Sequence, residues 1–267
     1  MEFNLGVIGA GNMAGAILNG VLSAGILSPE QIYLSNHHAD KLAPWSERGL
    51  HTTTDNQEVV RASDLVLLAV KPQVLKKDVL PELKDLVGGK CIISIAAGIS
   101  SDELKKALPD CHVVLAMPNT PLLLKKGVTV MVRREETIPQ NMYDAVTEIF
   151  SSAGTVDFID ESQINAVIPV SGSSPAFFFR MANVMVQAAG EFGIEPQTAL
   201  TLTARTMEGA AEMLLHSGKT AEELTRQVCS PGGTTLAALT AWDEFQFESM
   251  MRESFQRCIR RAEELGQ

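Results

Sequence analysis

The chain has 267 residues, which at about 150 residues per domain gives one large domain or two small ones. Hydrophobic residues make up 45% and charged residues 20%, a composition that excludes a disordered chain. The 32 acidic and 22 basic side chains give a formal charge of −10. An acidic chain without a basic run is a poor partner for nucleic acid or an anionic membrane, so we expect neither.

The four cysteines are scattered along the chain and form no Cys-x-x-Cys pair. We therefore expect neither a zinc ribbon nor a thioredoxin-type motif, no metal site, and free thiols in a reducing cytoplasm. The first seven residues lack the basic and apolar segments of a signal peptide. The purest apolar run, Leu65–Val70, has six residues and is too short to span a membrane.

Up to about residue 155, short apolar runs alternate with amphipathic stretches, which predicts βαβ units and a parallel sheet. The expected strands are 3–8, 31–35, 65–70, 91–95 and 113–117. Beyond residue 160 no strand pattern is found, and glycine- and proline-containing breakers separate helical segments. These expected helices are 161–169, 175–193, 197–215, 220–228, 233–241 and 245–264.

The segment 175–193 has an unusual helical pattern. Between residues 176 and 189 only Arg180, Asn183 and Gln187 are polar, and spacings of three and four place them on one narrow stripe. A helix that is apolar over most of its circumference must be buried on several sides. We interpret it as a contact with a second copy of the chain; the alternative is a central core helix of a monomer.

A glycine-rich turn lies between the first expected strand and the first expected helix. Its sequence fits the GxGxxG/A dinucleotide fingerprint in the required position, so residues 1–160 are predicted to form a Rossmann-type, doubly wound parallel sheet. Residues 161–267 then form an all-helical second domain. The helix N-terminus would hold the pyrophosphate. The predicted cofactor-binding residues of this turn are Gly9, Ala10, Gly11, Asn12 and Met13.

The second strand ends in Ser35-Asn36-His37-His38, and the next carboxylate is Asp40. An enzyme built for NAD usually has an acidic residue here for the ribose 2′-hydroxyl. Its absence favours NADPH, but the arginine typical of 2′-phosphate binding is also absent, so NADH stays an alternative. His37 and His38 are either cofactor neighbours or solvated loop residues.

Three further loops follow expected strands, and in a parallel sheet such loops meet at the ligand-binding edge. Their small residues permit close approach to ribose and nicotinamide, although short strand-to-helix turns often have this composition. The residues assigned to the cofactor in these loops are Ala69, Val70, Lys71, Pro72, Ala97, Gly98 and Asn119.

The second half of the chain lacks a general base of the kind that alcohol dehydrogenases use. No lysine occurs between Gly127 and Gly218, and the only histidine there is His216. Reduction of a protonated imine needs no strong base. The loop Cys229–Thr235 offers backbone N–H groups at a helix start and hydroxyls, which suit a carboxylate and a ring nitrogen. The alternative is a capped hinge between two helices.

Six motifs together resemble pyrroline-5-carboxylate reductases over nearly the whole chain. They are residues 9–14, 69–72, 96–98, 117–121, 171–176 and 230–235. The resemblance implies NAD(P)H-dependent reduction of 1-pyrroline-5-carboxylate to L-proline, the last step of proline biosynthesis. It also implies a dimer with interlocked helical domains, and some members assemble dimers into decamers. A reductase of a related cyclic imine and a non-catalytic NADP-binding regulator are the alternatives.

The resemblance also assigns residues to the substrate and to the cofactor. It makes Thr235 the catalytic residue, because this threonine matches the one that hydrogen-bonds the ring nitrogen. The other implied substrate-binding residues are Glu161, Gln227, Ser230, Gly232, Gly233 and Thr234, and the implied contacts to the adenosine half of the cofactor are Ser35, Asn36 and Asn56. The chain departs from the family pattern at Leu115, Ala116, Pro169 and Phe177.

Overall fold

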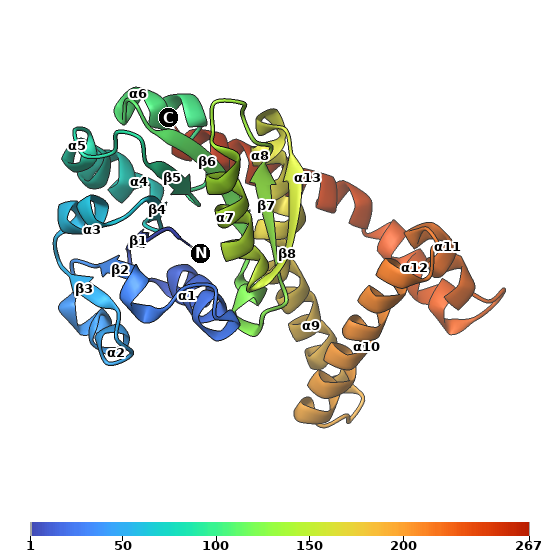
Figure 1. Ribbon diagram of the computed structural model, residues 1–267. Coiled ribbons are helices and arrows are strands. Elements are labelled where there is room, and N and C mark those ends of the chain that lie inside the picture. The colour runs from blue at the N-terminus through green and yellow to red at the C-terminus, as the bar shows by residue number, and fades with distance from the viewer. Residues whose placement is uncertain (1, 267) are drawn as a thin grey trace. The chain divides into compact units, whose positions relative to one another are not determined.

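The computed structural model describes residues 2–266 and divides the chain into two compact units. The first consists of Met1–Pro175 together with Cys258–Gln267, and the second of Ala176–Arg257. Eight strands form one sheet in the first unit (Figure 1). They are β1 Leu5–Ile8, β2 Ile32–Ser35, β3 His51–Thr53, β4 Leu65–Leu68, β5 Cys91–Ser94, β6 His112–Pro118, β7 Gly127–Val132 and β8 Gly154–Ile159.

The strand order is β3-β2-β1-β4-β5-β6-β7-β8, with β1 to β6 parallel. This is the doubly wound order of dinucleotide-binding sheets, in which β1 and β4 are parallel neighbours and the direction in which successive strands are added to the sheet reverses between them. β7 pairs antiparallel with β6, and β8 pairs parallel with β7. The predicted fold class is therefore confirmed, with one antiparallel pairing added.

Helices cover both faces of the sheet because alternate strand residues point to opposite faces. On one face, Val7 and Leu67 pack with α1 (Asn12–Ala24) and α7 (Gln140–Ser151). On the other face, Ile8 and Leu68 pack with α3 and α6. The other α-helices that lie wholly in this unit are α2 Ala43–Ser46, α3 Asn56–Ala62, α4 Pro72–Val74, α5 Leu80–Leu83, α6 Ser101–Ala107 and α8 Ile164–Val167. Short 3₁₀ and π-helical turns join them, among them the π-helical turn η6 Ile168–Gly172.

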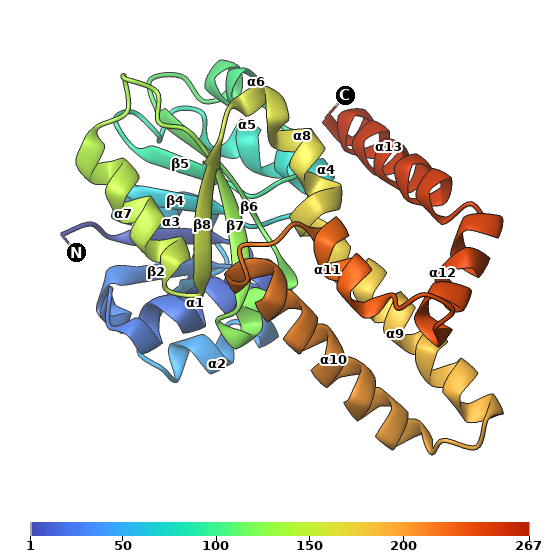
Figure 2. The same ribbon diagram turned by 90° about the vertical axis from the view of Figure 1, so that its right-hand side faces the viewer.

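The helical part of the chain closely follows the expected segments. Figure 2 shows α9 leading into a turn and α10 running back from it, so that the chain direction in the two helices is opposite. No strand follows Ile159 in the described residues, as the sequence predicted. The helices are α9 Ser174–Glu191, α10 Pro196–His216, α11 Ala221–Val228, α12 Thr234–Glu244 and α13 Phe247–Gly266.

The second unit has almost no buried core of its own. Within residues 176–257, all of which the structure describes, Ala199 is the only buried apolar residue. In α9, Phe178 and Phe179 are 51% and 67% exposed, and Met185 is 47% exposed. The alternative interpretation of α9, a helix buried in the core of a monomer, is therefore wrong for this chain.

None of the helices within residues 2–266 combines the length and the apolar character needed to cross a membrane.

Candidate active site

The glycine-rich turn connects β1 to α1. Gly9 has a φ of +105°, a conformation that L side chains rarely adopt, and a Cβ there would lie 2.7 Å from the Ala69 carbonyl oxygen. Gly11 is the N-cap of α1 and is exposed; a Cβ on it would have no neighbour within 4 Å. No side chain caps the amides of this helix start. The turn therefore leaves open the space and the N–H groups that a pyrophosphate needs.

Of the predicted contacts to the adenosine half, Ser35 and Asn36 lie at the end of β2 and Asn56 begins α3, and all three are hydrogen-bonded within the protein. The Ser35 hydroxyl is fully buried and donates to Asn56 Oδ1 at 2.7 Å, while Asn56 Nδ2 donates to Glu82 at 3.0 Å. Asn36 is half-buried, and its Oδ1 accepts the His38 N–H at 2.9 Å. Ser35 would have to release Asn56 before donating to a phosphate, so these three assignments remain predictions.

The loops after β4 and β5 lie at the same edge of the sheet, since the two strands pair in parallel. Lys71 is exposed, and Pro72 begins α4. Gly98 has a φ of +80° and lies against Ala262 and Gly266 in the last turns of α13. The Lys76 amine donates to the Gly266 carbonyl oxygen, which holds the same end of α13. Gly98 thus packs against the C-terminal end of α13, a contact that the sequence pattern did not indicate.

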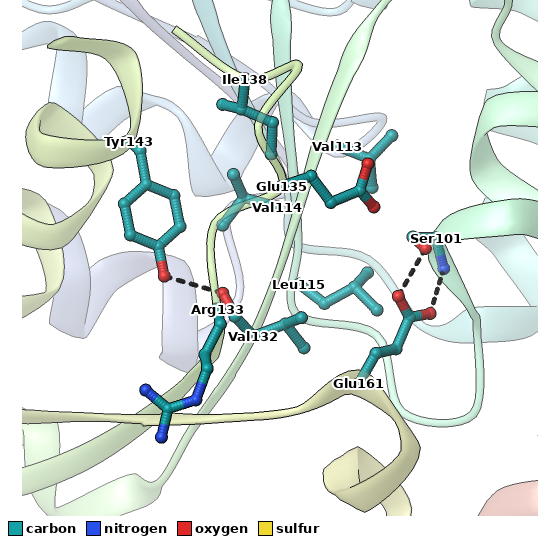
Figure 3. Close-up of a pocket in the computed structure, with 10 residues that line it drawn as sticks. All are labelled: Ser101, Val113, Val114, Leu115, Val132, Arg133, Glu135, Ile138, Tyr143 and Glu161. Atoms are coloured by element: carbon teal, nitrogen blue, oxygen red, sulfur yellow. Dashed lines mark hydrogen bonds between the residues drawn. The ribbon is translucent and has the colours of Figure 1, made fainter. Parts of the chain in front are cut away.

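Glu161 does not point into open solvent in the structure. Its carboxylate accepts hydrogen bonds from the Ser101 backbone N–H at 2.8 Å and from the Ser101 hydroxyl at 2.5 Å (Figure 3). Ser101 begins α6, so Glu161 supplies a negative charge to an N-terminal turn. The sequence pattern did not identify Ser101 as this partner. The available signal was the pair Ser100-Ser101 at the start of α6, because serine commonly caps helix N-termini.

The loop between α11 and α12 contains a β-turn, Ser230–Gly233, with a glycine at its third position. Pro231 stands at the second position, Gly232 has a φ of +71°, and the Gly233 N–H donates to the Ser230 carbonyl at 2.9 Å. Gly233 is the N-cap of α12, whose first amides receive no side-chain cap. The turn therefore presents free N–H groups beside two hydroxyls, those of Thr234 and Thr235.

Two predicted substrate residues at the ends of this loop differ in their exposure to solvent. Thr235 is half-buried in the first turn of α12, whereas Gln227 is exposed in the last turn of α11. Both lie in the second unit, while Glu161 lies in the first.

Candidate bases and nucleophiles are scarce among the described residues. His216 is exposed and pairs with Glu212 at 3.1 Å on the surface of α10. Burial raises the pKa of the Cys91 thiol to about 12 and that of Cys111 to about 11, so both thiols stay protonated near neutral pH. In residues 2–266 no three histidine, cysteine or carboxylate side chains gather in a cluster that could hold a metal ion.

Comparison with known proteins shows which family models and relatives match this chain. The family model for pyrroline-5-carboxylate reductase dimerisation matches residues 161–265, and the model described as NADP oxidoreductase coenzyme F420-dependent matches residues 4–98. A pyrroline-5-carboxylate reductase of Escherichia coli is 35% identical over 268 residues, covering 100% of this chain and 99% of its own. The chain belongs to the pyrroline-5-carboxylate reductase family.

Two further relatives support this family membership. The reductase of Methanosarcina acetivorans is 37% identical over 265 residues, covering 98% of this chain and 97% of its own. A solved structure of the family, from Coxiella burnetii, is 33% identical and superposes with a TM-score of 0.88 over 100% of both chains. The family assignment made from six sequence motifs is thereby confirmed.

Proposed function

We propose that this chain reduces 1-pyrroline-5-carboxylate to L-proline with NADPH. The observation that carries the proposal is the full-length match to pyrroline-5-carboxylate reductases at 35% identity. The uncapped N-terminus of α12 and its two flanking hydroxyls supply a receptor of the right chemistry for an imino acid.

The cofactor is NADPH, and it supplies the hydride. The NADP oxidoreductase model covers β1 to the loop after β5, and no carboxylate follows β2 before Asp40. Within this segment the Gly9–Gly11 turn and the start of α1 would hold the pyrophosphate.

The residues of the loop between α11 and α12 bind and orient the substrate and do not abstract a proton from it. Ser230, Thr234 and the N–H groups at the start of α12 are suited to the substrate carboxylate, and the Thr235 hydroxyl is suited to the ring nitrogen. When hydride adds to the imine carbon, the π electrons of the C=N bond become a lone pair on nitrogen. A protonated imine therefore yields the neutral amine, and no lysine or histidine base is needed.

The direct test is the loss of NADPH absorbance when purified protein is mixed with 1-pyrroline-5-carboxylate. We expect consumption above a heat-inactivated control, a higher kcat/KM with NADPH than with NADH, and inhibition by proline. Turnover confined to a six-membered cyclic imine, or tight cofactor binding without any turnover, would contradict the proposal. These outcomes correspond to the alternative imine reductase and to the non-catalytic regulator.

We further propose that the smallest active assembly is a dimer formed through the second unit. The dimerisation model of the family covers residues 161–265, and the apolar residues of α9 and α10 are exposed in the single chain. Exposed apolar surface of this extent in a folded chain marks an interaction site. Dimers of this kind can also be the units of a decamer.

Substitution of Phe179 by glutamate is expected to produce monomers, because it places a charge on a side chain that is 67% exposed in the single chain and would be buried between two chains. Light scattering coupled to size exclusion at micromolar concentration measures the mass. The matched control is Leu124→Glu, which changes an 80% exposed leucine in the first unit and should leave the mass at that of the wild type. A wild-type protein that is monomeric under these conditions would refute the dimer.

We also propose a cytoplasmic location. Its support is the set of four free thiols at Cys91, Cys111, Cys229 and Cys258, none of which is paired in a disulfide.

A further inference from the structure

Asn119 lies between three segments of the first unit. Its side chain follows β6, is 7% exposed, and makes two hydrogen bonds. Oδ1 accepts the Val128 N–H in β7 at 2.9 Å, and Nδ2 donates to the Ser171 carbonyl oxygen in η6 at 3.1 Å. Both polar groups of the amide are thus used by the protein, although the sequence pattern assigned Asn119 to the cofactor.

The Ser171 carbonyl needs this donor because a proline stands four residues after it. In a continuing α-helix, the carbonyl of residue 171 would accept the N–H of residue 175. Residue 175 is Pro175, which has no N–H. A buried carbonyl without a donor costs free energy, and Ser171 is 8% exposed. The Asn119 amide replaces the missing helical hydrogen bond.

The turn that contains Ser171 is wider than an α-helix. Ile168–Gly172 is π-helical, and the Ser173 N–H reaches back five residues to the Ile168 carbonyl at 2.7 Å. Such turns are frequent at functional sites. Among the described residues, no backbone hydrogen bond joins this turn to the Met117–Pro121 loop. The hydrogen bond between the π-helical turn and the Met117–Pro121 loop is therefore made by the side chain of Asn119.

We propose that Asn119 is a positioning residue of the reductase, which fixes the Ser171–Pro175 turn against the carboxyl end of β6. The proposal rests on the function proposed above. In this role Asn119 acts through Ser171 and Val128, to which its amide is hydrogen-bonded, and not through a contact with cofactor or substrate. Its loss should therefore reduce kcat at saturating NADPH and leave the affinity for NADPH unchanged.

The diagnostic variant is Asn119→Asp. The carboxylate keeps the size of the side chain and the acceptor for Val128, but it cannot donate to Ser171 while ionised. Burial and the facing Ser171 carbonyl oxygen should raise the pKa of the new carboxyl well above its ordinary value. We therefore expect kcat to fall at least about tenfold near pH 8 and to recover as the pH is lowered to about 6, where the protonated carboxyl regains a donor. The wild type should not show this recovery. Asn141→Asp, on the exposed side of α7, introduces the same charge and should leave the pH profile unchanged.

A second variant tests the link from the other side. Pro175→Ala restores an N–H four residues after Ser171, so the double variant Asn119→Asp, Pro175→Ala should regain most of the kcat lost near pH 8. This rescue distinguishes positioning from a general loss of folding, which a second substitution would only worsen.

The outcomes separate this inference from the proposed function. An inactive wild type refutes the proposed function, and the inference is then decided by hydrogen exchange. Exchange of the amides of residues 168–175 should be faster in Asn119→Asp than in wild type and Asn141→Asp. Unchanged exchange, unchanged kcat, or a weakened NADPH affinity with normal kcat at saturation would each overturn the positioning role.

Discussion

Replacing Thr235 by alanine is expected to lower kcat/KM for 1-pyrroline-5-carboxylate by roughly 5- to 150-fold. This range corresponds to about 1–3 kcal/mol, the cost of leaving one polar partner unpaired in the transition state. The hydroxyl lies in the first turn of α12, and no side chain caps that helix start. Steady-state kinetics with varied substrate at saturating NADPH measure the effect.

The matched control for Thr235 is Thr240→Ala in the same helix. The Thr240 hydroxyl is exposed and donates to the Leu236 carbonyl at 3.0 Å, so its loss should leave kcat/KM within about twofold of the wild type. Thr235→Ser keeps the hydroxyl and should recover most of the activity. Wild-type kinetics in Thr235→Ala would remove this residue from the mechanism.

The two glycines of the first turn should respond in opposite ways to alanine. At Gly9, the positive φ and the Ala69 carbonyl oxygen at 2.7 Å from a new Cβ predict a loss of about 1–3 kcal/mol of folding stability. At Gly11 a Cβ meets nothing within 4 Å, so the protein without cofactor should keep its wild-type Tm. The new methyl group would instead occupy the space needed for the pyrophosphate and weaken NADPH binding at least about tenfold, or ~1.4 kcal/mol.

Thermal melts without cofactor and titration of NADPH by fluorescence distinguish the two glycine variants. Each serves as the control for the other, because both add one methyl group to the same turn. A lowered Tm in Gly11→Ala, or unchanged NADPH affinity in that variant, would contradict the assignment of this turn to the pyrophosphate.

The architecture was largely predictable because its signals are local. The central strands β1, β4 and β5 are apolar runs, and the glycine turn occurs where the first of them meets a helix. The expected strand list omitted β3, β7 and β8. β3 has three residues, and β8, with the sequence GTVDFI, carries an aspartate and is only partly buried. Such strands are specified by the neighbour they pair with, which a single-sequence pattern does not contain.

The side-chain partners within the candidate site could not be predicted. Ser35 and Asn56 are 21 residues apart and meet because β2 and the start of α3 are neighbours in the fold. Glu161 and Ser101 are 60 residues apart, and their pairing depends on the arrangement of β8 and α6. A motif shows which residue types are present, whereas only the folded chain shows which of them already have a partner.

The exposed apolar surface of α9 and α10 has a consequence for how this chain becomes a folded protein. Residues 176–257 bury almost no apolar side chain by themselves, and hydrophobic burial is the main force that offsets the loss of chain entropy. With a second copy supplying the missing core, folding of these helices and the meeting of two chains become one event. The free energy of unfolding is then set by protein concentration as well as by sequence.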